Sequence, residues 1–152
     1  MTELAPPPQQ CSILVVEDNS YLQHLLQTSL VTAGYDVITN SDGQGISKLI
    51  EQQTVDLILL DLILPNKSGK EVVKEVRTVS QVPIIILSAF ADPDCLVECL
   101  ALGADEFIAK PFSFNIMMAR VEALLRRIEW NSVDDSQFRK HEIFVEMDNA
   151  KN

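Results

Sequence analysis

The chain has 152 residues, of which 47% are hydrophobic and 22% are charged, and these values are typical of one globular domain with short tails. Its formal net charge of −10 excludes a nucleic-acid surface built from this segment itself, because phosphate contacts require clustered Lys and Arg. No apolar run is long enough to cross a membrane, and the start lacks the pattern of a signal peptide. Cys11, Cys95 and Cys99 lack disulfide spacing, so we expect reduced thiols in a cytoplasmic protein that does not bind membranes.

Strand and helix patterns alternate five times along the chain, after a tail over residues 1–10 that Pro6, Pro7 and Pro8 keep out of helix. The predicted strands are short and mostly apolar, and they cover Ser12–Val16, Tyr35–Thr39, Asp56–Asp61, Val82–Leu87 and Glu106–Ala109. The predicted helices carry apolar residues at helical spacing, and they cover Ser20–Ala33, Ser41–Gln53, residues 69–79, Asp92–Leu102 and Ser113–Glu129.

The third strand indicates the kind of sheet, because Leu57 to Leu60 are apolar without alternation. Such a run is typical of a parallel sheet that helices cover on both faces. Five strand–helix repeats with short connections therefore predict an α/β doubly wound domain, whose commonest strand order at this size is the flavodoxin-like 2-1-3-4-5. Ligands bind such sheets beyond the carboxyl ends of the strands, near the point where the strand order reverses.

Polar residues follow the carboxyl ends of four predicted strands. Glu17 and Asp18 follow the first strand and Asp61 ends the third, so the expected order brings three carboxylates into one crevice. Crowded carboxylates repel each other, and Mg²⁺ suits a site with few protein oxygens because it keeps several of its waters. Asp61 could then act as a nucleophile towards a phosphoryl group, with Lys110 pairing with one phosphoryl oxygen and the Ser88 hydroxyl donating to another.

The set Glu17-Asp18, Asp61, Ser88-Ala89 and Lys110-Pro111 resembles the response-regulator receiver family of two-component signalling, which has the CheY-like fold. The resemblance covers residues 12 to about 128. It implies that a sensor histidine kinase donates the phosphoryl group to Asp61, and that the protein performs only self-phosphorylation and self-dephosphorylation.

The same resemblance implies two further features. The main-chain carbonyl of Ile63 would complete the magnesium site. A switch would follow phosphorylation, in which Ser88 moves towards the phosphate and Phe107 turns inward.

The segments Leu102–Phe107 and Ala119–Arg127 are similar to those of transcription regulators of the OmpR/PhoB type. That similarity implies a homodimer, formed on phosphorylation through the fourth helix, the fifth strand and the fifth helix. Asp105, Glu106 and Arg120 match the charge pattern of this dimer surface. Cys95 and Glu122 stand where basic residues are usual, which leaves the strength of the dimer open.

The chain is thus expected to contain a receiver domain over residues 11–128 and a polar linker over 129–140. Residues 141–152 are either the start of a truncated effector domain or a disordered tail, and DNA would be bound only through an effector that this chain does not contain. The alternative function, from the class of binding modules, is a phosphate-independent dimerisation or adaptor module with an inherited pocket. Nucleotide binding is disfavoured, because neither G-x-G-x-x-G nor a P-loop follows the first strand.

Overall fold

The computed structural model describes residues 10–89 and 92–129, so the predictions for the tail, nearly all of the linker and residues 141–152 lie outside the described residues. The chain divides into two compact units, residues 1–118 and 119–152, and the sheet lies in the first. Its strands are β1 (Ser12–Val16), β2 (Asp36–Asn40), β3 (Leu57–Leu60), β4 (Ile84–Ser88) and β5 (Glu106–Ala109). The helices between them are α1 (Ser20–Thr32), α2 (Ile46–Gln52), α3 (Gly69–Val79) and α4 (Pro93–Leu102). A fifth described helix covers residues 114–129.

The strands form one parallel sheet in the order β2-β1-β3-β4-β5, which confirms the predicted order. The register between β1 and β3 decides where their carboxyl ends lie. Val16 is paired with Leu60 at the end of the β1–β3 ladder, and the Asp61 amide donates to the Val16 carbonyl at 3.0 Å. The residues that follow these two strands are therefore brought to the same edge of the sheet.

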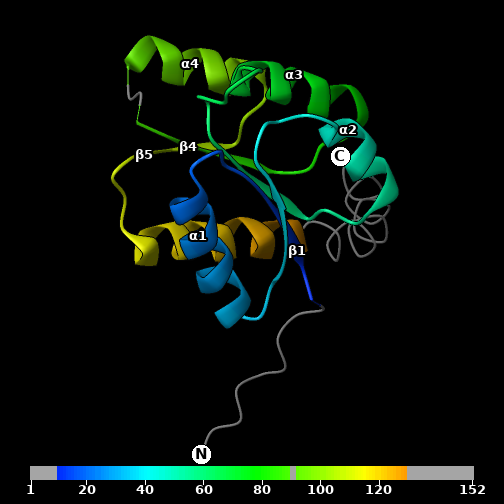
Figure 1. Cartoon of the computed structure of the whole chain (residues 1–152), viewed down its shortest axis with the longest axis vertical. Coiled ribbons are helices and arrows are strands. Elements are labelled where there is room, and N and C mark those ends of the chain that lie inside the picture. The colour runs from blue at the N-terminus through cyan, green and yellow to red at the C-terminus, as the bar shows by residue number, and fades with distance from the viewer. Residues whose placement is uncertain (1–9, 90–91, 130–152) are drawn as a thin grey trace, which may run out of the picture. The chain divides into compact units, whose positions relative to one another are not determined.

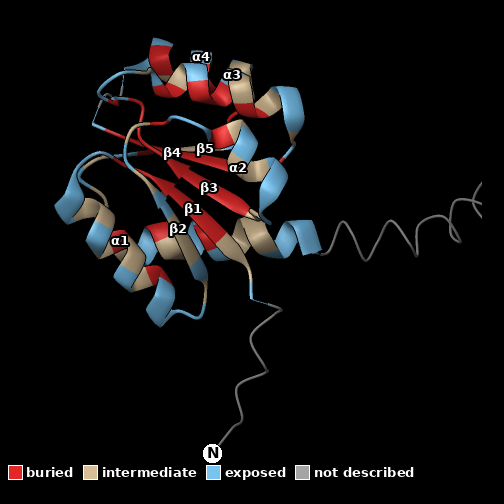
Figure 2. Ribbon diagram, turned by 45° about the vertical axis from the view of Figure 1, so that its right-hand side comes forward, coloured by how far each residue is buried: buried red, intermediate tan, exposed pale blue. Residues whose placement is uncertain are grey.

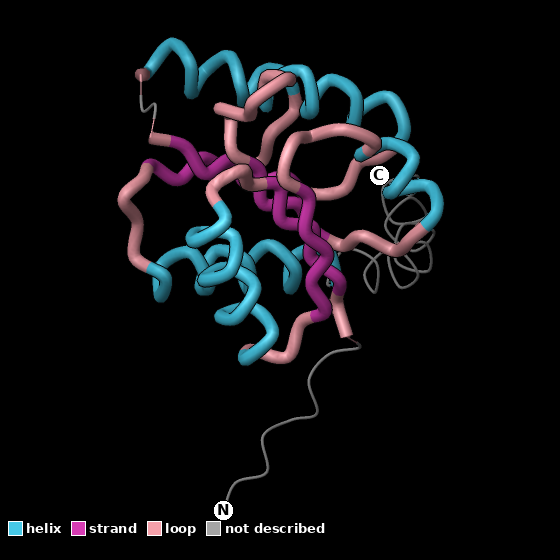
Figure 3. The backbone as a smooth tube through the Cα atoms, viewed as in Figure 1, coloured by secondary structure: helices cyan, strands magenta, loops and turns pink. Residues whose placement is uncertain are grey.

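Helices cover both faces of the sheet, with α1 on one side and α2, α3 and α4 on the other (Figures 1 and 3). All four residues of β3 and all five of β4 are buried, and Figure 2 shows buried strands at the centre of the domain. Their apolar runs can be buried on both faces because each face has its own helices. One core cluster lies on the α2–α4 side, and Cys95 and Cys99 of α4 belong to it. Cys11, Cys95 and Cys99 form no disulfide with one another.

Helix α2 begins five residues later than the sequence indicated, at Ile46 instead of Ser41. The Asn40 side chain accepts from the amide of Gly43 at 2.7 Å, and this bond ties the backbone into a turn. Gly43 and Gly45 then take positive φ angles of 78° and 70°, which a right-handed helix does not allow. The apolar residues Ile46, Leu49 and Ile50 of the helix do face the core, but the predicted start of the helix is wrong.

Arg77 ties the end of α3 to the end of α4 and to the start of β4. Its guanidinium donates to the Val82 carbonyl at 2.7 Å and twice to the Gly103 carbonyl, at 3.0 and 2.7 Å. It also pairs with Asp105 at 3.2 Å, and the same carboxylate oxygen accepts from the Ile84 amide at 2.8 Å. Gly103 permits this approach, since a Cβ there would lie 2.9 Å from the Arg77 Nε. One side chain thus satisfies carbonyls on two separate segments.

We predict that Arg77→Met lowers the free energy of unfolding by about 2–4 kcal/mol, because it leaves partly buried carbonyls without their charged donor. Urea denaturation would measure the change. The matched control is Lys70→Met on the same helix, which breaks the exposed pair between Lys70 and Glu98. Exposed pairs contribute little, so the control should stay near the wild type, and equal losses in both variants would contradict the role given to Arg77.

Candidate metal and phosphoacceptor site

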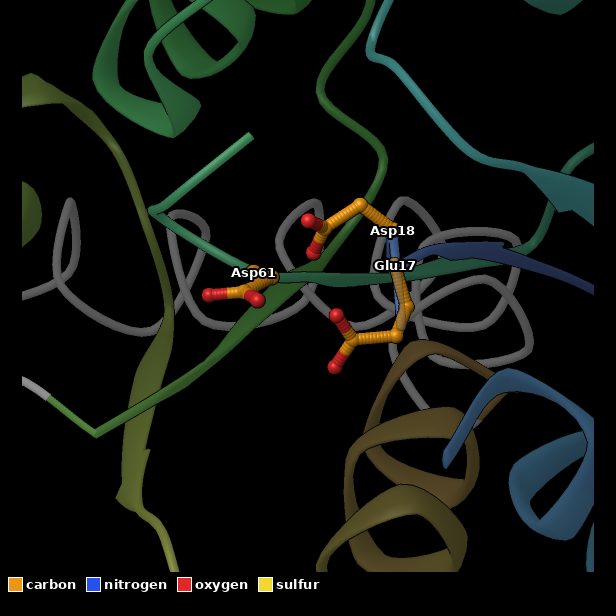
Figure 4. A group of neighbouring side chains, drawn as sticks. All are labelled: Glu17, Asp18 and Asp61. Carbon is orange, nitrogen blue, oxygen red and sulfur yellow. The ribbon is translucent and has the colours of Figure 1, made fainter. Parts of the chain in front are cut away.

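Three carboxylates meet where β1 and β3 end. Glu17, Asp18 and Asp61 each offer one oxygen, and these oxygens lie within 4.8 Å of one another. Figure 4 shows the three side chains facing a common space. Glu17 and Asp61 are only 2% and 7% exposed, whereas Asp18 is exposed. The arrangement is a small acidic site in which two carboxylates are buried and the third is exposed to solvent.

Lys110 directly follows the carboxyl end of β5, and its side chain reaches this site. Its ammonium group donates to Glu17 Oε1 at 2.6 Å and to Asp61 Oδ2 at 3.1 Å. The peptide bond between Lys110 and Pro111 is cis. The sequence predicted that Lys110 would pair with a phosphoryl oxygen, but not that it would bridge two of the acids. In this structure Lys110 is the counter-ion of the acid cluster.

Burial and the neighbouring acid together set the protonation of Glu17. Burial, together with Asp61, raises the pKa of Glu17 from 4.5 to about 7, even though the hydrogen bond from Lys110 acts in the opposite direction. Burial also opposes the charge on Lys110, but its contacts with Glu17 and Asp61 prevail and raise its pKa. Lys110 therefore stays charged near neutral pH, while burial and Asp61 favour the protonated form of Glu17.

The other residues predicted for the pocket lie after β3, at the end of β4 and within β5. Ser88 is the fully buried last residue of β4, paired with Ala109. The Ile63 amide donates to Asp61 Oδ1 at 3.1 Å, and the Ile63 side chain is 58% exposed. Phe107 is half-buried and packs against the core cluster. The roles expected of Ser88, Ile63 and Phe107 stay predictions.

Gly69 is a residue whose part in the site the sequence did not reveal. Its amide donates to the Leu62 carbonyl at 2.8 Å, which closes the loop between β3 and α3. A Cβ at this position would lie 2.5 Å from the Leu62 Cα and 2.6 Å from the Asp61 carbonyl oxygen. Glycine is therefore required here by close backbone approach, and α3 begins directly against the segment that carries Asp61.

The residues predicted for a dimer surface have different surroundings. The Asp105 carboxylate is held within its own chain by Arg77 and the Ile84 amide. Glu106 is the first residue of β5, and Arg120 lies in the helix over 114–129. Cys95 is buried in the core cluster. The pairing of Asp105, Glu106 and Arg120 across two copies stays a prediction.

The donor set fits a magnesium ion. It consists only of carboxylate oxygens, which are hard ligands, and no cysteine or histidine belongs to this cluster of described residues. A cation would also offset the burial and the repulsion by Asp61 that raise the pKa of Glu17, because it stabilises the ionised form. Among the described residues, no helix has the length and apolar character that crossing a membrane requires.

Comparison with known proteins agrees with this geometry. The family model for the response regulator receiver domain matches residues 13–122, and the chain therefore belongs to that family. It is 46% identical over 118 residues to the alkaline phosphatase synthesis transcriptional regulatory protein PhoP of Bacillus subtilis, a match that covers 77% of this chain and 49% of that protein. It is 39% identical over 127 residues to the transcriptional regulatory protein AfsQ1 of Streptomyces coelicolor, covering 84% and 56%.

Among solved structures, the BeF3-activated N-terminal receiver domain of Klebsiella pneumoniae RstA superimposes with a TM-score of 0.72 at 29% identity, covering 76% of this chain and 98% of that domain. The chain spans about half the length of the curated relatives it matches. The predicted fold and receiver family are both confirmed, as is the similarity to regulators of the OmpR/PhoB type.

We predict that the titration of Glu17 lowers the free energy of unfolding of the metal-free protein as the pH rises from about 4.5 to about 7. Across this window the folded state binds more protons than the unfolded state, so the free energy of unfolding falls with pH and levels off above 7. Mg²⁺ should stabilise the protein more at pH 8 than at pH 5.5, because it competes with that proton. Urea denaturation across this range, with and without Mg²⁺, would measure both effects.

Glu17→Gln is the control for this prediction, because the amide cannot titrate. The variant should lose the downward slope between pH 4.5 and 7. An unchanged slope would show that other groups cause it.

Proposed function

We propose that the protein is a phosphorylation-dependent signalling switch, in which Asp61 accepts a phosphoryl group from the phosphohistidine of a sensor histidine kinase. The observation that supports this most is the placement of Asp61: a nearly buried carboxylate, 3.1 Å from a charged lysine and beside two further acids at the mouth of the sheet. Neighbouring acids alone would make such a carboxylate a poor nucleophile. The lysine and a cation compensate for that charge.

In the proposed reaction, an oxygen of Asp61 attacks phosphorus, and the bond from phosphorus to the histidine nitrogen breaks. Glu17, Asp18, Asp61 and the Ile63 carbonyl would hold Mg²⁺, and the ion would neutralise negative charge on the transferring group. Lys110 then exchanges one of its carboxylate contacts for a phosphoryl oxygen. It needs little movement for this, because its ammonium group already lies at the Asp61 carboxylate. The Ser88 hydroxyl donates to a second phosphoryl oxygen.

The output of this switch is the dimer surface formed by α4, β5 and the helix over 114–129. Ser88 and Phe107 belong to neighbouring strands that connect the pocket with this surface, since Ile86 pairs with Phe107 and Ser88 with Ala109. A homodimer formed on phosphorylation would present an effector domain to DNA. The relatives PhoP and AfsQ1 are transcriptional regulatory proteins, which supports a transcriptional output. We place this switch in the cytoplasm.

The first test is the incorporation of phosphate from a small acyl phosphate in the presence of Mg²⁺. The wild type should be labelled, and Asp61→Asn should lose at least nine-tenths of the label because the amide is not a nucleophile. Asp56→Asn is the matched control, since Asp56 precedes β3 at its other end and binds the Ser12 amide. Equal labelling of wild type and Asp61→Asn would defeat the assignment.

The alternative is a phosphate-independent dimerisation or adaptor module with an inherited pocket. The departure of Glu122 from the basic residue expected at its position favours it, because the charge pattern of the switching dimer is incomplete. Sedimentation of the 17.0 kDa chain with and without beryllofluoride separates the two functions. We expect beryllofluoride with Mg²⁺ to shift the protein towards dimers, and Arg120→Glu to abolish the shift while labelling of Asp61 continues. Identical sedimentation in both states would favour the adaptor.

A further inference from the structure

The loop between β1 and α1 is held by its backbone at Glu17. The Glu17 amide donates to the Asn40 carbonyl at the end of β2, at 3.0 Å. The Glu17 carbonyl accepts from the side-chain amide of Gln23, at 2.9 Å. Both backbone groups of Glu17 are therefore fixed by residues outside the loop, and only the second of these bonds comes from a side chain.

Gln23 joins this loop to another one. It lies in the first turn of α1, where its backbone amide donates to the Asn19 carbonyl at 2.9 Å. Its side-chain amide also donates to the Ser41 hydroxyl at 3.1 Å. Ser41 follows Asn40, whose own side chain ties the backbone into a turn at Gly43. The amide of Gln23 thus connects the acid-carrying loop to a neighbouring loop that has its own internal bonds.

The bond to the Glu17 carbonyl acts on Asp18 as well. This carbonyl belongs to the planar peptide unit that links the two acids, so fixing its oxygen fixes the plane from which the Asp18 backbone continues. The Asp18 side chain is exposed, and the loop bends at this residue. Without the tether, repulsion among three carboxylates would favour backbone conformations that separate them.

We propose that Gln23 is a positioning residue that holds the Glu17-Asp18 loop in its cation-binding arrangement before the cation arrives. This inference rests on the proposed function, because it concerns the same metal site. Gln23 touches neither the cation nor the phosphoryl group. Because Gln23 orders the loop in advance, metal binding does not have to order it. The free-energy cost of that ordering would otherwise weaken the affinity for Mg²⁺.

The test is the affinity of the full chain for Mg²⁺, measured by calorimetry on Gln23→Met. Met has a similar length but no donor, and it should weaken Mg²⁺ binding about tenfold, the lower end of what residues supporting metal ligands contribute. Ser41→Ala removes only the second bond of Gln23 and should leave the affinity within about twofold. Gln27→Met, one turn further along α1, controls for a general effect of Met on the helix.

Urea denaturation of each metal-free variant separates positioning from folding. We expect Gln23→Met to unfold near the wild-type midpoint, and if it does not, Gln23→Ala at a temperature where it is fully folded gives the same comparison. An unchanged Mg²⁺ affinity in a folded Gln23 variant, or an equal loss in Gln27→Met, would overturn the inference while the proposed function stands. A wild type that does not bind Mg²⁺ at millimolar concentration would instead overturn the proposed function.

Discussion

The structure depends on one electrostatic constraint, which is the close approach of three carboxylates at the ends of two adjacent strands. Parallel pairing of β1 with β3 leaves no alternative, because Val16 and Leu60 are register partners and the acids follow them directly. Lys110 compensates for part of this charge from a position 93 residues away from Glu17 in the sequence. Burial keeps the interaction strong, since the ammonium group and two of the carboxylates are shielded from water. The pocket thus holds a positive charge next to negative charges before any ligand binds.

Buried strands and hydrogen-bonded loops support this charged group. Strands β3 and β4 are buried along their whole length, so neither can move without disturbing a core on each face. The loops that leave the strands are tethered individually: Gln23 holds the first, and Gly69 closes the loop after Asp61. At the opposite edge, Arg77 and Asp105 fix the start of β4.

Residue patterns predicted the architecture and the pocket, but not the contacts between polar side chains. Strands β1 and β5 have the predicted bounds, because apolar runs flanked by polar residues leave little choice. The start of α2 was misplaced, since side-chain bonds from Asn40 compete with the helix and leave no periodic signal. Asp105 matched a surface charge pattern, yet its carboxylate binds Arg77, a pairing across 28 residues that no local pattern encodes. The three acids were predicted because they directly follow the apolar runs of β1 and β3, and the ends of such runs can be recognised in a sequence.

Gly69 has a consequence for how this gene can change. Every missense mutation of a glycine codon adds at least a Cβ atom, and here that atom would overlap the backbone of Leu62 and the carbonyl of Asp61. Neither neighbour is the end of a pliable side chain, so neither can rotate away. A substitution of Gly69 is therefore tolerated only if the backbone of the segment that carries Asp61 changes its conformation at the same time. The evolutionary freedom of the site is limited by a residue that has no side chain.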